Sequence, residues 1–78
     1  MSNITVIMHE DNGMAKDISI PSEVTADSLL TALNGAYRTG KKQAVAIRTE
    51  NPLAYLCGNT KVEDAGLHDG SDIYFVED

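Results

Sequence analysis

Hydrophobic and polar residues alternate in two short segments at the start of the chain, residues 4–9 and 15–20. A period of two is typical of a β-strand with one face turned inward. Between them lies Asn12-Gly13, which can adopt the positive φ angles of a tight reversal. The pattern predicts a β-hairpin that ends before Pro21, because proline has no amide hydrogen for strand pairing. Its expected inward positions are Ile4, Val6, Met8, Ile18 and Ile20.

The next apolar pattern has the period of a helix. Thr25 can accept a hydrogen bond from a free first-turn amide, so we expect it to cap the helix, with Val24 packing on Leu29. Gly40 is the expected stop. The apolar stripe of this helix consists of Leu29, Leu30, Leu33, Ala36 and Tyr37.

Alternation returns in the second half of the chain. Residues 44–48, 53–57 and 73–76 are each expected to form a strand, separated by turn residues such as Asn51-Pro52 and Asp69-Gly70. The segment 62–67 is too short for a full helix and predicts a single 3₁₀-like turn closed by Gly66. The expected order of elements is therefore two strands, a helix and three strands.

A single helix covers only one face of a sheet, so this order predicts a two-layer α+β domain. We expect residues 1–78 to form one domain with the ubiquitin-like β-grasp fold, a five-stranded mixed sheet packed on one helix. The first strand should pair in parallel with the last, because the helix carries the chain across the sheet. The predicted shared core consists of Leu29, Leu33, Val45, Ile47, Leu67, Ile73 and Phe75.

Charge and composition narrow the classes of partner. The chain has 12 acidic and 6 basic residues and a net charge of −6, which disfavours nucleic acid. Its single cysteine, the lack of a signal-peptide pattern and the lack of a long apolar run favour a cytoplasmic protein without membrane insertion. Residues 62–78 contain no lysine or arginine. They form either an ordinary solvated surface or a docking surface for a basic partner.

The residue types that carry chemistry do not form a recognisable catalytic pattern. Segments His9-Glu10-Asp11 and His68-Asp69 lack the spacing of a zinc site. Cys57 has no neighbour in sequence that would activate a thiolate, so we expect a structural strand residue. Phosphate-binding glycine loops are absent from the sequence. These observations favour a protein that is not an enzyme and uses no metal or cofactor.

Several segments resemble one family in order and spacing. They are residues 20–26, Leu29, Leu33-Asn34, Ala36-Tyr37, Gly40, Glu50-Asn51-Pro52-Leu53-Ala54, Leu56, Gly58-Asn59, Gly66-Leu67 and Asp69-Gly70, followed by Ile73 and Phe75. The pattern is similar to that of the small YukD-like (EsaB-like) proteins and covers nearly the whole chain. The resemblance implies a ubiquitin-like accessory protein of the type VII secretion system of Gram-positive bacteria, which exports WXG-motif proteins. It would act on the cytoplasmic side, recruited to the membrane by a partner protein of the secretion machinery.

The resemblance implies no active site, because the family has none whose residues could be carried over to this sequence. The sequence ends Val76-Glu77-Asp78 and lacks the diglycine tail that ubiquitin uses for conjugation. A small ubiquitin-like structural subunit of a multicomponent oxygenase is the alternative interpretation. Neighbouring genes would distinguish the two, because secretion ATPase genes support the first and diiron hydroxylase genes the second.

A protein-binding surface is thus the functional hypothesis. If Val45, Ile47, Ile73 and Phe75 face the helix, the residues between them face outward, and the candidate binding residues are Ala46, Arg48, Tyr74 and Val76. Tyr74 would be the anchor and Arg48 a polar contact. The competing interpretation is an ordinary solvated sheet face, since scattered exposed apolar residues are normal.

Overall fold

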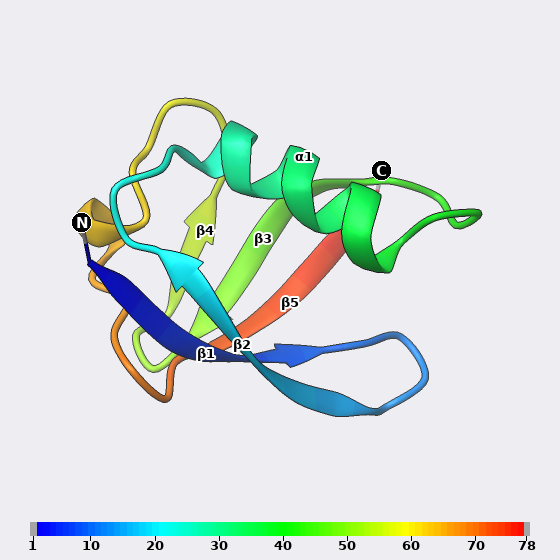
Figure 1. The fold of residues 1–78 in the computed structure, drawn as a ribbon, viewed down its shortest axis with the longest axis horizontal. Coiled ribbons are helices and arrows are strands. Elements are labelled where there is room, and N and C mark those ends of the chain that lie inside the picture. The colour runs from blue at the N-terminus through cyan, green and yellow to red at the C-terminus, as the bar shows by residue number, and fades with distance from the viewer. Residues whose placement is uncertain (1, 78) are drawn as a thin grey trace.

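A computed structural model describes residues 2–77; Met1 and Asp78, the ends of the predicted domain, lie outside the described residues. The described chain forms a sheet, a helix and a 3₁₀ turn (Figure 1). In chain order these are β1 (Asn3–His9), β2 (Ala15–Pro21), α1 (Ala26–Tyr37), β3 (Ala44–Glu50), β4 (Ala54–Leu56), η1 (Glu63–Ala65) and β5 (Asp72–Glu77).

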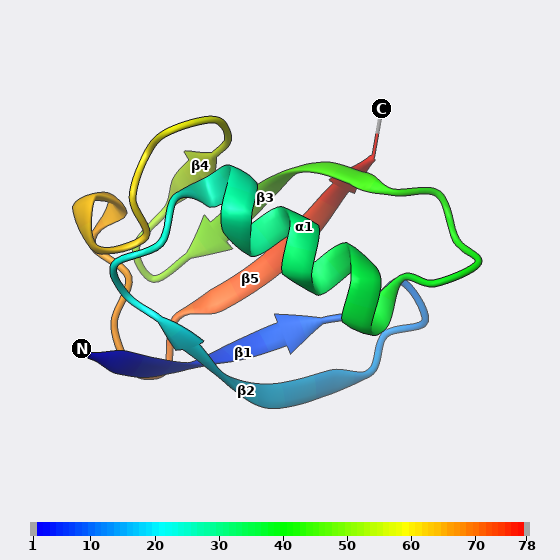
Figure 2. The same cartoon turned by 45° about the horizontal axis from the view of Figure 1, so that its top comes forward.

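The sheet has five strands in the order β2-β1-β5-β3-β4. β1 and β5 are parallel, whereas β1 with β2, β3 with β4 and β3 with β5 are antiparallel. Figure 2 shows α1 lying across one face of this sheet. The α+β class and the β-grasp arrangement predicted from the hydrophobic pattern are confirmed, including the parallel pairing of the first and last strands.

The β1–β2 hairpin follows from its turn residues. Gly13 has a φ of 85°, and the Asn12 side-chain oxygen accepts a hydrogen bond from the Met14 amide at 3.0 Å. The pairing runs further than predicted, because Pro21 lies within β2 opposite Asn3. β2 is an edge strand, where a missing amide donor is tolerated.

Helix α1 begins as predicted but ends earlier. Thr25 is the N-cap and its hydroxyl oxygen accepts a hydrogen bond from the Ser28 amide at 3.2 Å. The last helical residue is Tyr37, with Arg38 as the C-cap, so Gly40 lies beyond the helix end. Leu29, Leu30 and Leu33 are buried as expected, but Ala36 is exposed.

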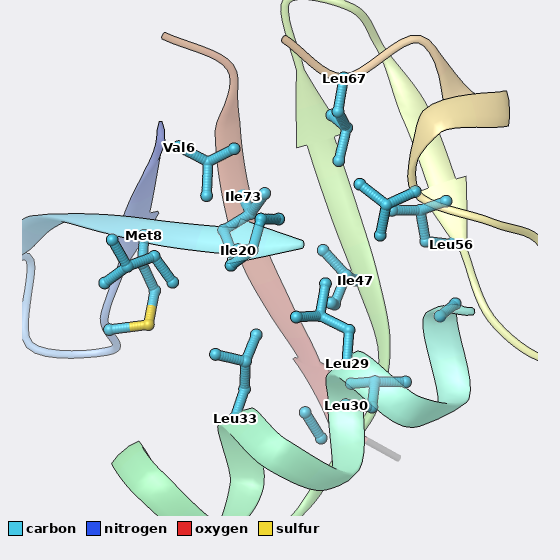
Figure 3. Packing of buried hydrophobic residues seen from close by; sticks show 14 residues of the cluster. Val6, Met8, Ile20, Leu29, Leu30, Leu33, Ile47, Leu56, Leu67 and Ile73 are labelled. Carbon is cyan, nitrogen blue, oxygen red and sulfur yellow. The ribbon is translucent and has the colours of Figure 1, made fainter. Parts of the chain in front are cut away.

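The apolar core lies between α1 and the sheet (Figure 3). Of the predicted core residues, Leu29, Leu33, Ile47, Leu67 and Ile73 are buried, and Phe75 packs against them partly buried. Val45 was predicted wrongly. A β-bulge between Ala44 and Ala46 turns Val45 outward, where it is 50% exposed, and Ala44 and Ile47 supply the core contacts of β3 instead.

The segment after β4 also differs from expectation. Cys57 lies just beyond Leu56, the last residue of β4, and its side chain is exposed. It is therefore not the structural strand residue that was predicted. The turn η1 is confirmed, and Gly66 closes it with a φ of 83°. The helices found within residues 2–77 lack the length and apolar character needed to cross a membrane.

Candidate functional site

The candidate site is the outer face of the sheet, the face that α1 leaves uncovered (Figures 1 and 2). Strand pairing places four side chains in one row across it, one each from four neighbouring strands. His9 of β1 lies beside Tyr74 of β5, Tyr74 lies opposite Arg48 of β3, and Arg48 lies opposite Tyr55 of β4. Residues directly opposite each other in a sheet project their side chains to the same face. We call this set the aromatic row.

Tyr74 is the centre of the aromatic row. Its ring stacks on the His9 ring, with centroids 4.3 Å apart and the planes inclined by 11°. The Arg48 guanidinium carbon lies 4.2 Å from the centroid of the same ring. Because β5 lies between β1 and β3, His9 and Arg48 approach Tyr74 from opposite sides. Cation–π and stacking contacts of this kind favour a fixed arrangement of the three side chains.

Two carboxylates complete this arrangement. Asp72 lies 2.8 Å from the His9 Nε2 atom, and one Glu50 oxygen accepts a hydrogen bond from Arg48 at 2.8 Å. The other Glu50 oxygen accepts a hydrogen bond from the Tyr74 hydroxyl at 3.3 Å. Partial burial, followed by the negative charge of Glu50, raises the pKa of Tyr74 above its usual 10.0. A tyrosine hydroxyl is protonated at neutral pH in any case, so it acts as the donor in this hydrogen bond.

Strand pairing places all four predicted binding residues on the outer face, where Arg48 and Tyr74 are in direct contact. Val76 lies beside them on the outer face and is half-buried. Ala46 lies opposite Val76 on the same face but is only 2% exposed, so the expectation that it is available to a partner is wrong. Both faces of the Tyr74 ring are covered by neighbours, which makes Tyr74 a support for Arg48 and His9.

Four members of the site were not among the predicted binding residues: His9, Glu50, Tyr55 and Asp72. Tyr55 is 60% exposed and is the aromatic side chain of the row that a partner can reach most easily. Its place on the face depends on the pairing of β3 with β4, which alternation within one strand does not reveal. The alternation of residues 4–9 did contain a signal for His9, since it lies out of phase with Val6 and Met8.

The described residues offer little for small-molecule chemistry. No group of three or more histidine, cysteine, aspartate or glutamate side chains within residues 2–77 is placed to hold a metal ion. No pocket was found on this part of the chain either. What the outer face can do is present charged and aromatic side chains in a fixed order to another macromolecule.

Comparison with models of known protein families and with curated proteins gave no match for this chain.

Proposed function

We propose that this protein acts by binding another protein through the outer face of its sheet, and that it performs no catalysis. The observation that carries the proposal is the stack of His9, Tyr74 and Arg48, with the exposed Tyr55 beside it. Side chains already held in place lose little conformational entropy when a partner binds. Aromatic and arginine side chains are also those that most often dominate binding energy at protein interfaces.

We further propose that the partner belongs to the type VII secretion machinery and that the protein supports export of WXG-motif proteins from the cytoplasmic side. The support is the resemblance of the segments Glu50-Asn51-Pro52-Leu53-Ala54 and Gly58-Asn59, together with the helix segment, to the YukD-like pattern. The β-grasp fold is compatible with that family, whose members are ubiquitin-like.

The test is export of a WXG-motif substrate from cells in which variants replace the wild-type protein. Tyr55→Ala and Arg48→Ala should each reduce export, because each removes a side chain with substantial exposure from the outer face. At an interface such truncations cost about 1 kcal/mol or more of binding free energy. Met14→Ala is the matched control, since Met14 is as exposed as Tyr55 but lies in the hairpin turn.

Melting temperatures of all three variants must be measured alongside export. Reduced export by the first two variants, with folding intact and Met14→Ala unaffected, supports the proposal. If Tyr55→Ala and Arg48→Ala fold normally and export is unchanged, the outer face has no role in secretion.

A further inference from the structure

We infer that the outer sheet face docks a cationic, amphipathic segment of a partner protein; this inference rests on the proposed function of that face. It comes from a second row of side chains next to the aromatic row. Strand pairing places Asp17 beside Ile7, Ile7 beside Asp72, and Asp72 opposite Glu50. Three of these four side chains are carboxylates, and they span β2, β1, β5 and β3. We call this set the acidic row.

The acidic row is incompletely neutralised within the protein. Asp72 and Glu50 face each other directly, an arrangement of like charges that destabilises a sheet. His9 and Arg48 pair with these two carboxylates, but both carboxylates keep part of their surface in solvent. Asp17 is exposed and has no ion pair within the described part of the chain. The face therefore presents excess negative charge that a cationic partner would offset.

The lysine of β2, Lys16, does not offset the negative charge of the outer face. Lys16 lies opposite Met8, whose side chain is buried in the core, so Lys16 projects to the helix side of the sheet. There its ammonium lies 5.2 Å from the centroid of the Tyr37 ring. Within residues 2–77, Arg48 is the only arginine on the outer face, and it is already paired with Glu50.

The apolar groups of the face argue for an amphipathic segment and against a simple basic tail. Ile7 is half-buried in the middle of the acidic row, and Tyr55 is exposed at the end of the aromatic row. A segment with apolar side chains for these two positions and lysine or arginine on either side would match both rows. Anionic partners such as nucleic acid or acidic lipid surfaces would be repelled.

The experiment uses a synthetic amphipathic peptide of leucine and lysine, and a counterpart with glutamate at every lysine position. Binding to the full chain is followed by amide chemical shifts in NMR spectra and by titration at two salt concentrations. Asp17→Lys tests the acidic row without removing an ion pair seen in the described residues. Asp64→Lys is the matched control, because it makes the same charge change on η1, outside the sheet.

We expect the lysine peptide to shift the amides of the two rows and to bind more weakly at high salt. Asp17→Lys should weaken its binding at least about fivefold, whereas Asp64→Lys should change it by less than about twofold. The inference is overturned if the glutamate peptide binds as tightly, if both variants weaken binding equally, if the shifts lie elsewhere, or if neither peptide binds.

The result of the peptide experiment can be distinguished from the result of the export test. If Tyr55→Ala reduces export but the peptide result is negative, the face binds a protein of different chemistry. If the peptide binds as expected while cells with Tyr55→Ala export normally, the preference of the outer face for a cationic segment is supported. The proposed role of that face in secretion is then contradicted.

Discussion

Arg38 joins three parts of the chain through a side chain that is only 2% exposed. Its guanidinium donates to the Lys42 carbonyl from Nε at 3.1 Å and from Nη2 at 2.8 Å. It also pairs with Glu77 at the end of β5 and with Asp11 in the hairpin turn, and it lies 4.9 Å from the centroid of the Phe75 ring. One side chain thus ties the end of α1 to both the first hairpin and the last strand.

Arg38→Ala should lower the free energy of unfolding by about 2–3 kcal/mol, because it removes several charge-assisted hydrogen bonds and the packing of the alkyl stem. Lys41→Ala, an exposed neighbour of like charge, should change it by no more than about 0.5 kcal/mol. Urea unfolding followed by circular dichroism gives both values. Equal midpoints for the two variants would show that Arg38 has no special structural role.

Titration of Tyr74 is expected to lower the stability of the protein at alkaline pH. Its pKa is raised by partial burial and by Glu50, so the folded state holds the hydroxyl proton more tightly than the unfolded chain. The stabilisation is complete below the unfolded pKa of about 10 and is lost as the pH rises through the higher folded value. Tyr74→Phe cannot lose this proton, so its unfolding midpoint should fall less steeply than that of the wild type above pH 10. Parallel curves for the two proteins would contradict this.

At the scale of elements, the bulge in β3 decides which residues face the core. Ala44 and Ile47 both reach the core although they are three positions apart, since the bulge inserts an extra residue into the strand. Asn34 of α1 is hydrogen-bonded to the first residue of β3. Its side-chain amide donates to the Ala44 carbonyl at 3.1 Å, and its side-chain oxygen accepts from the Ala44 amide at 2.9 Å. Helix and strand are thereby held together at the bulge.

The bulge can be tested with two neighbouring substitutions. Ala46→Asp places a carboxylate at a covered position and should cost about 2 kcal/mol or more of the free energy of unfolding. Val45→Asp places the same group at an exposed position and should cost less than about 1 kcal/mol. Chemical denaturation of both proteins measures the difference. A regular strand without a bulge would give the reverse order.

At the scale of the whole molecule, one small core supports every element. Residues from α1, from all five strands and from the segment around η1 contribute to a single apolar cluster. A domain of this size is stabilised by only about 5–15 kcal/mol, so the loss of one large core side chain removes a substantial part of that stability. We expect the loss to affect the entire fold because small single domains unfold cooperatively.

Leu33→Ala should lower the free energy of unfolding by about 2–5 kcal/mol, since Leu33 is buried against the sheet (Figure 3). Ala36→Ser, at an exposed position one turn along the same helix, should cost about 0.5 kcal/mol through helix propensity alone. Calorimetry should show one transition shifted to lower temperature for Leu33→Ala. A wild-type melting temperature for that variant would mean that the helix contributes little to the core.

Much of the architecture was determined by the sequence alone. Alternating apolar residues indicated the strands, three- and four-residue spacing indicated α1, and Thr25 and Gly66 marked where local elements begin and end. These features depend on the chain's own neighbours, so a linear pattern carries them. The order of the elements then predicted a two-layer α+β domain, because one helix can cover only one face, and the β-grasp was the expected arrangement of that class.

Only the tertiary structure decided which way the side chains point near the β3 bulge, and which residues make up the outer face. The bulge turned Val45 outward, against the prediction, and brought Ala44 into the core, since one extra residue shifts the phase of alternation. Arg38 and Asn34 are buried because distant partners satisfy their polar groups, which composition and periodicity cannot reveal. The aromatic and acidic rows likewise exist only because strand pairing places residues up to 65 positions apart, such as His9 and Tyr74, side by side.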